Sequence, residues 1–347
     1  MIPVIDIAPI FGAAGPARDR ADAAIIEAAT VHGFMTVTGL PGNVPLGEDA
    51  RASMMRFFTL DRDARMRLAR QKYAPGNANI YRGYFPLKEG DPTYKEGIDL
   101  GPDIADPAAI AADDPLREAT PLPDEHDLPG WRAEAAAYHR AMAGVGAALM
   151  RAIARGLGLD ENFFEAPFRD GVSTLRIIRY PARSPDSLAA LAPELVLDGD
   201  ERRYIVGTAH HDSGFVTLLN QDALGGLHAR VRHGARNGDW LDVPAREDGL
   251  AVNFGQLLER WTGGRVKATE HRIASPNRER VSVPFFYEPA VDAVIRPLPL
   301  AGAQPFEPFA YGDHVWSWMS KFIEFQGLED KRPPRGVKDG VKSGVAA

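Results

Sequence analysis

The chain has 347 residues, and its 40 basic and 47 acidic side chains leave a formal net charge of −7. A hydrophobic content of 45 % and a charged content of 25 % are ordinary for a globular protein and exclude intrinsic disorder. Cysteine is absent, which excludes disulfide frameworks, zinc fingers, iron–sulfur clusters and cysteine nucleophiles. Any metal site must therefore use nitrogen and oxygen ligands.

Charge and hydropathy also bear on partners and compartment. The acidic balance and the lack of a Lys/Arg cluster argue against a nucleic-acid partner. Residues 1–10 are apolar but contain Asp6 and two prolines and no basic residue, which predicts an ordered strand instead of a signal peptide. No apolar run approaches the roughly 18 residues that span a bilayer. We therefore expect a soluble cytoplasmic protein with no membrane partner.

The first half of the chain favours helices. Composition predicts them over residues 17–31, over residues 45–71 with an interruption near residues 57–60, and most strongly over residues 131–157. Residues 74–125 between them are rich in Gly, Pro and Asp and contain the aromatic cluster of residues 81–85. This stretch is expected to be an irregular loop over a site.

The second half changes to short β-segments separated by turns. The predicted strands are residues 173–180, 216–220, 227–232, 241–243, 250–254 and 280–287. Asn237-Gly238 and Gly263-Gly264 lie between such segments and are hairpin signals. Strands at this spacing indicate a β-sandwich or a double-sheet jelly roll.

The C-terminal region combines a helix with a polar tail. A final amphipathic helix is predicted after Asp313, with Val315, Met319, Phe322 and Ile323 on one face. The tail from Gly327 onward is charged and rich in Gly and Pro, so we expect it to be extended or mobile.

A candidate metal site begins with a His-x-Asp pattern. His210 and Asp212 are two residues apart, so in an extended chain their side chains point to the same face while His211 points to the other. A second histidine would complete a 2-His-1-carboxylate triad, which is the ligand set typical of non-haem Fe(II) with open positions for oxygen and substrate. His271, shortly before the strongest predicted strand, is the best candidate for that third ligand.

The same strand offers a carboxylate-binding pair. Arg280 and Ser282 again share a face, and a guanidinium fork with a hydroxyl donor suits a dicarboxylate cosubstrate. Phe286 has the same parity and is expected to line the pocket. Each pattern alone occurs by chance, and a lone strand histidine is more often structural. The ordered combination inside a β-rich region is what indicates a site.

With these residues in place, the sequence resembles the isopenicillin N synthase-like branch of Fe(II)- and 2-oxoglutarate-dependent oxygenases. The similarity covers nearly the whole chain and is most specific at residues 210–219, 253–255, 271–272 and 280–282. It implies an α+β fold with a distorted jelly-roll (double-stranded β-helix) core, an N-terminal helical region and a C-terminal helix. It also implies His210, Asp212 and His271 as iron ligands and Arg280 and Ser282 as the grip on 2-oxoglutarate, with O2 consumed.

The resemblance also gives a division of the chain. We expect a mainly helical N-terminal region over residues 1–165, the jelly-roll core over residues 166–290, and a C-terminal helix and tail over residues 291–347 that pack on the core. Together these parts form one β core with helical additions.

One segment leaves the use of 2-oxoglutarate open. Many plant members have Asn-x-Tyr-Pro on the early core strand, whereas this chain has Ile178-Arg179-Tyr180-Pro181. Tyr180 is retained and is expected beside the cosubstrate. The Ile-Arg-Tyr-Pro form is similar to isopenicillin N synthase, an oxidase that works without 2-oxoglutarate and in which the Arg-x-Ser pair is thought to hold the substrate carboxylate. A non-catalytic cupin-like metal-binding protein is the alternative of another class.

The substrate is expected to be a small molecule, possibly one that bears a carboxylate. Tyr81, Arg82 and Tyr84 in the irregular segment, together with Phe286, are the candidate substrate residues. An ion pair for the arginine and simple packing for the aromatic residues are equally good explanations of these side chains.

Overall fold

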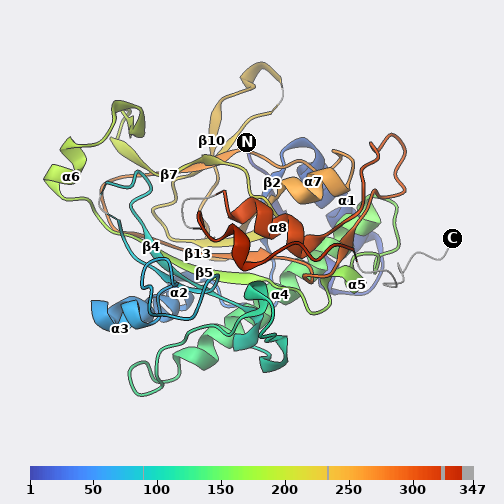
Figure 1. Cartoon of the computed structure of the whole chain (residues 1–347). Coiled ribbons are helices and arrows are strands. Elements are labelled where there is room, and N and C mark those ends of the chain that lie inside the picture. Colours follow the sequence, from blue (N-terminus) through green and yellow to red (C-terminus); the bar gives the residue numbers. More distant parts are fainter. Residues whose placement is uncertain (89, 233, 322–324, 338–347) are drawn as a thin grey trace.

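Two β-sheets and a layer of helices make up the fold, seen in a computed structural model that describes residues 1–88, 90–232, 234–321 and 325–337 (Figure 1). In this part of the chain the larger sheet has the strand order β1-β2-β11-β8-β13-β5-β4-β3, and the smaller sheet has the order β10-β9-β12-β7-β6. The expected α+β class with a jelly-roll core is confirmed, and the two sheets supply that core.

The larger sheet is antiparallel except where β1 runs parallel to β2. Its strands are β1 (Val4–Asp6), β2 (Phe34–Thr38), β3 (Gly83–Phe85), β4 (Glu96–Leu100), β5 (Thr174–Tyr180), β8 (Val216–Gln221), β11 (Leu250–Phe254) and β13 (Arg280–Tyr287). The strands of the smaller sheet are β6 (Val196–Leu197), β7 (Arg203–His210), β9 (Leu227–Arg230), β10 (Trp240–Asp242) and β12 (His271–Ser275). A separate pair is formed by β14 (Val294–Ile295) and β15 (Phe309–Ala310).

Helices cover one face of the larger sheet. Figure 1 shows α4 (Trp131–Gly156), in green, along the side of this sheet that faces away from β7. The other α-helices are α1 (Pro16–Val31), α2 (Gly47–Met55), α3 (Arg62–Arg67), α5 (Glu165–Phe168), α6 (Pro185–Ala189), α7 (Gln256–Trp261) and α8 (Tyr311–Met319). Short 3-10 turns connect several of these elements.

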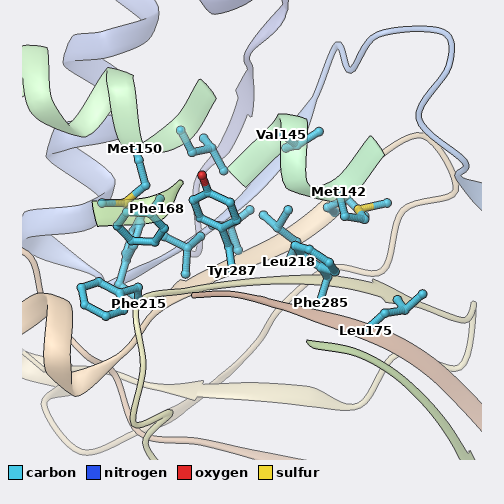
Figure 2. Packing of buried hydrophobic residues seen from close by; sticks show 14 of the residues in the cluster. Met142, Val145, Met150, Phe168, Leu175, Phe215, Leu218, Phe285 and Tyr287 are labelled. Carbon is cyan, nitrogen blue, oxygen red and sulfur yellow. The ribbon is translucent and has the colours of Figure 1, made fainter. Parts of the chain in front are cut away.

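Side-chain alternation along β13 separates the core from the site. Phe285 and Tyr287 point to the helices and pack under Met142 and Met150 of α4, as Figure 2 shows. Full burial of one such side chain contributes roughly 1.5–3 kcal/mol, so this layer stabilises the packing of α4 on the sheet. The residues of opposite parity on β13 face the smaller sheet.

The space between the two sheets holds a second, smaller hydrophobic cluster. Phe34, Leu219 and Ala251 of the larger sheet meet Leu227 and Ala229 of the smaller one. These contacts hold the sheets face to face, which allows side chains of both sheets to approach one another.

Most predicted elements are present. The helices over residues 16–31, 47–55, 62–67 and 131–156 match the predicted ones closely, and β11 and β13 have the predicted bounds. The expected irregular segment 74–125 contains β3 and β4, which the sequence did not predict. Strand β4 was not predicted because it contains the charged residues Glu96 and Asp99, which are rarely buried in a strand. Here both are buried in ion pairs with arginines.

One of the two predicted hairpins is wrong. Asn237-Gly238 does connect the antiparallel strands β9 and β10. Gly263-Gly264, however, ends helix α7: both glycines have positive φ angles, of 61° and 79°, and the Gly264 N–H donates to the Glu259 carbonyl at 2.8 Å. Left-handed glycines suit a hairpin turn, but they also terminate helices. Here they follow the amphipathic helical segment of α7, so they end a helix.

The C-terminal region differs from expectation in its tail. Helix α8 is present, although the predicted Phe322 and Ile323 lie outside the described residues. Residues 327–337 are held to the fold by hydrogen bonds and are not mobile, and residues 338–347 of the predicted tail lie outside the described residues. The Arg332 side chain is 3 % exposed and donates to Asp114 at 2.9 Å and Asp313 at 2.8 Å.

The predicted division at residues 165 and 290 stays a prediction, and hydrogen bonding crosses the first boundary. Strands β1 to β4 come from the N-terminal region, and β2 and β4 pair with β11 and β5 of the core. No helix among the described residues is long and apolar enough to cross a bilayer.

Candidate metal centre and carboxylate pocket

Two neighbouring strands bring the predicted metal ligands together. His210 ends β7 and His271 begins β12, and the two residues are direct partners in the antiparallel ladder. Asp212 follows β7, and its Oδ1 lies 3.7 Å from His210 Nε2 and 3.6 Å from His271 Nε2. One ligand atom from each residue lies within 4.8 Å of the others, a spacing suited to a single metal ion.

Both imidazole rings are oriented by their own strands. His210 Nδ1 lies 2.7 Å from the Thr208 carbonyl, and His271 Nδ1 lies 3.1 Å from the Thr269 carbonyl. A carbonyl can only accept, so the proton of each ring belongs on Nδ1. The lone pair of each Nε2 is therefore directed to the place where the ligand atoms converge.

The carboxylate of Asp212 is held by two donors. Thr217 Oγ1 donates to Asp212 Oδ2 at 2.5 Å, and Asn253 Nδ2 donates to the same oxygen at 2.6 Å. Burial would raise the pKa of Asp212, but His271, His210 and these two hydrogen bonds outweigh it and hold the pKa below its usual value. Oδ1 thus stays anionic and free to bind a cation.

His210 is suited to the neutral state that a metal ligand requires. Desolvation, with repulsion from His271, lowers the pKa of His210 to about 4, although 43 % of the side chain is exposed. His211 lies outside this group of ligands, as its position in the extended chain predicts. It lines a separate surface cavity of about 280 Å³ with Arg232 and Glu270.

Arg280 and Ser282 form a buried polar pair on β13. Their side chains are 0 % and 1 % exposed. The Arg280 Nε donates to the Gly225 carbonyl at 2.8 Å, and one Nη donates to Gln221 Oε1 at 3.4 Å. The other Nη and the Ser282 hydroxyl have no hydrogen-bond partner among the described residues. Buried donors without a partner are costly, so these two groups fit a carboxylate ligand.

Tyr180 packs beside this polar pair. It is the direct partner of Arg280 across the β5–β13 ladder, and the Arg280 guanidinium lies 5.2 Å from the centroid of the Tyr180 ring. The ring keeps the guanidinium plane fixed and excludes water from one side of it. Ile178 pairs with Ser282 on the same face, so an apolar side chain lies next to the polar pair.

The Arg280–Ser282 pair and Asp212 lie on the same side of the larger sheet, the side that faces the smaller sheet with His210 and His271. Phe286 has the parity of Arg280 and Ser282, and its ladder partner on β8 is Thr217, which binds Asp212. Strand geometry therefore places the ligand Asp212 near Phe286 and the guanidinium farther along the same strand.

The other predicted substrate residues have different placements. The Arg82 side chain is 1 % exposed and donates to the Val172 carbonyl at 2.8 Å and to Thr174. Tyr81 packs against Trp316, with 6.3 Å between ring centroids. Their roles stay predictions.

Tyr84 points to the opposite side of the larger sheet. Its ring lies 5.8 Å from that of Phe57 in the helical core, and its hydroxyl donates to Glu96 at 2.5 Å. The structure does not bring Tyr84 to the metal ligands.

Several polar residues near the site were not identified from the sequence. Thr217 and Asn253 come together only because β8 pairs with β11. Arg176 donates to Asp99 at 2.6 Å and 2.8 Å, and its guanidinium lies 5.4 Å from the Phe286 ring centroid. The Arg176–Asp99 pair could have been predicted only if residues 96–100 had been recognised as a strand. The charged residues of that segment made it look like a loop.

Comparison with known proteins now identifies the family. Residues 176–289 match the 2OG-Fe(II) oxygenase superfamily, and residues 2–125 match the family described as non-haem dioxygenase in morphine synthesis N-terminal. The chain is 31 % identical to isopenicillin N synthase of Streptomyces clavuligerus, covering 94 % of this chain and 97 % of the relative. It is 30 % identical to the 2-oxoglutarate-Fe(II) type oxidoreductase hxnY of Emericella nidulans, covering 90 % and 88 %.

Solved structures have the same fold. A full-length Neurospora crassa protein in complex with alpha-KG is similar with a TM-score of 0.74 and 23 % identity, covering 92 % of this chain and 96 % of that one. The rice dioxygenase for auxin oxidation is similar with a TM-score of 0.66 and 25 % identity, covering 92 % and 95 %. The chain therefore belongs to the 2OG-Fe(II) oxygenase superfamily, a family of oxidoreductases with Fe(II) and 2-oxoglutarate as cofactors.

Proposed function

We propose that the protein oxidises a small-molecule substrate, by hydroxylation, in a reaction that consumes O2 and 2-oxoglutarate and releases succinate and CO2. One oxygen atom enters the substrate C–H bond, and the other enters the new carboxylate of succinate, so the four electrons that O2 accepts are fully accounted for. Fe(II) supplies the redox chemistry that activates O2 when it is bound. The chain itself supplies the ligands and holds the cosubstrate.

In this proposal His210, Asp212 and His271 hold the iron. Three ligands from one side leave the remaining positions for the cosubstrate and O2. Their Nδ1 and Oδ2 contacts fix the direction of the free Nε2 and Oδ1 atoms, so little reorganisation accompanies metal binding.

The observation that carries the proposal is the pair of unsatisfied buried donors on β13. The Arg280 Nη and the Ser282 Oγ lack partners among the described residues, although both side chains are fully enclosed. A bound carboxylate would satisfy both at once. Tyr180 and Ile178 beside them would shield that carboxylate from water and strengthen its attraction to the guanidinium.

A small molecule is the proposed substrate. Phe286, Tyr81 and Arg82 are the residues we propose for substrate contact, and Tyr84 is a weaker candidate because of its place in the helical core. The structural neighbour from Neurospora crassa has been crystallised with thymine, and isopenicillin N synthases are among the relatives. Both support a small organic substrate, and neither fixes its identity for this chain.

A second candidate is an oxidase that uses Fe(II) and O2 without 2-oxoglutarate. The 31 % identity to isopenicillin N synthase and the Ile178-Arg179-Tyr180-Pro181 segment favour it. In that case Arg280 and Ser282 would hold the substrate's own carboxylate. The non-catalytic cupin-like alternative is set aside, because the chain belongs to an enzyme family.

The test is an anaerobic titration of the Fe(II)-loaded protein with 2-oxoglutarate, followed by the visible charge-transfer band of the complex. We expect a saturable band in the wild type and in Arg278→Gln, whose side chain is exposed, and a strongly weakened titration in Arg280→Gln. With O2 admitted, succinate should form in step with loss of 2-oxoglutarate. A wild-type protein that gives neither band nor succinate would favour the oxidase.

A further inference from the structure

A second buried carboxyl group lies next to the segment that carries Asp212. Glu288 is the first residue after β13 and has the parity of Ser282 and Phe286, so its side chain leaves the sheet on the side of the site. Its backbone N–H donates to Ser173 Oγ at 3.0 Å, which fixes the start of the side chain. The reaction proposed above gives this carboxyl group no role.

Two donors hold the carboxyl group of Glu288. The Tyr311 hydroxyl of α8 donates to Oε2 at 2.5 Å. The backbone N–H of Phe215 donates to the same carboxyl group. Glu288 therefore connects the C-terminal helix with the segment 213–215, which joins Asp212 to β8.

The segment 213–215 is packed tightly on both sides. A Cβ on Gly214 would lie 1.8 Å from Glu288 Oε1, so the backbone packs directly on the carboxyl group. On the other side, the Gly255 N–H donates to the Phe215 carbonyl at 2.9 Å, and the Gln256 N–H donates to the Asp212 carbonyl at 2.8 Å. The ligand segment is thus held between Glu288 and the start of α7.

Burial favours the neutral, protonated form of the Glu288 carboxyl group. Burial, helped by the charge of Asp212, raises the pKa of Glu288 to about 8, although the bonds from Tyr311 and Phe215 act in the opposite direction. At neutral pH the group is mostly protonated. A neutral carboxyl group has nearly the shape and polarity of a glutamine amide, so Gln is a close substitute.

We propose that Glu288 is a positioning residue for the iron ligand Asp212, and that Tyr311 makes this positioning depend on the seating of helix α8. The inference rests on the proposed function, because it takes Asp212 to be an iron ligand. Glu288 acts through Gly214 and Phe215 and sets where the Asp212 carboxylate lies relative to His210.

The experiment compares wild type, Glu288→Gln, Glu288→Ala and Tyr311→Phe. Three quantities are measured: the Kd for Fe(II) under anaerobic conditions, the position of the 2-oxoglutarate charge-transfer band, and kcat and KM for 2-oxoglutarate. Glu288→Gln should stay within about twofold of wild type. Glu288→Ala should raise the Kd for Fe(II) about tenfold, shift the band and lower kcat with little change in KM, and Tyr311→Phe should have a smaller effect of the same kind.

The matched control is Glu125→Ala. Glu125 also accepts a backbone N–H, from Gly130 at 2.5 Å, but in an exposed loop before α4. It should change none of the three quantities. If Glu288→Ala does not fold, Glu288→Asp, which is one methylene shorter, replaces it.

Wild-type Fe(II) affinity and an unshifted band in folded Glu288→Ala, or in folded Glu288→Asp where that variant replaces it, would overturn the positioning role, even if the variant melts at a lower temperature. Failure of the proposed function looks different. In that case Asp212→Ala would also leave Fe(II) binding unchanged, or the wild type would give no charge-transfer band with 2-oxoglutarate.

Discussion

His210 and His271 lie directly opposite each other in the antiparallel pair of β7 and β12, with 4.3 Å between their ring centroids. They are far apart in the sequence, and the pairing of the two strands is what places them on one metal. A ladder irregularity lies on the paired side of the histidines, between His271 and Ile273, and the ladder itself ends at the two histidines, where β7 ends and β12 begins. The metal centre is thus built at the end of a strand pair, where Asp212 can enter from the connecting segment.

The three ligands should each be essential for iron binding. We expect His210→Ala, Asp212→Ala and His271→Ala to weaken Fe(II) binding by more than about a hundredfold, beyond the roughly 10–100-fold cost of losing an outer hydrogen-bond partner. Anaerobic calorimetric titration measures the affinity. His211→Ala is the matched control, because this neighbouring histidine lies outside the group of ligand atoms. Equal losses in all four variants would point to unfolding instead of ligation.

The two donors to Asp212 should tune the same site more mildly. Asn253→Ala and Thr217→Val each remove one hydrogen bond to Oδ2. We expect Fe(II) affinity to fall by about tenfold in each variant, because the carboxylate loses its fixed orientation. In the double variant the Fe(II) affinity should fall further, but by less than the product of the two single fold-changes, since both hydrogen bonds are made to one oxygen atom. Unchanged Fe(II) affinity in both single variants would contradict the assigned role.

The Arg280–Ser282 pair on β13 should determine affinity for the cosubstrate and not for the metal. Arg280→Lys keeps the charge but loses the planar fork, and we expect the KM for 2-oxoglutarate to rise about 10–100-fold, which corresponds to the roughly 1.5–3 kcal/mol of a hydrogen bond to a charged group. Ser282→Ala should raise it by less than about tenfold. Steady-state succinate release measures KM, and the Kd for Fe(II) should stay constant. A change in metal affinity alone would argue that Arg280 and Ser282 do not bind the cosubstrate.

Glu288 should make the stability of the metal-free protein depend on pH. Its pKa is about 8 in the folded state and near its ordinary value of 4.5 in the unfolded chain, because burial disfavours the charged form. Between these values the folded state binds more protons, so stability falls as pH rises, by up to about 1.4 kcal/mol per pH unit. Below pH 4.5 this cost is absent, and above pH 8 it is complete.

Thermal melts from about pH 5.5 to about pH 8.5 test this dependence. The wild-type Tm should fall more steeply than that of Glu288→Gln, in which the titrating group is absent. Glu125→Gln serves as a control and should follow the wild-type curve. Parallel curves for wild type and Glu288→Gln would show that Glu288 does not titrate in this range.

The sequence by itself determined the features that depend on local periodicity. Side chains two residues apart share one face of a strand, so His210 with Asp212 and Arg280 with Ser282 could be paired before any tertiary structure was known. The long helix over residues 131–156 follows from its composition for the same local reason. The order of these motifs along the chain was enough to indicate the family.

Only the tertiary structure decided which groups support and complete the site. Thr217, Asn253 and Glu288 reach the Asp212 segment through the register of β8, β11 and β13 and through the docking of α8. The register of paired strands depends on contacts distant in sequence, which no local pattern records. The same limit on prediction from local sequence applies to strand β4. Its acidic residues are typical of a loop, and they are buried in a strand only because arginines from other elements neutralise them.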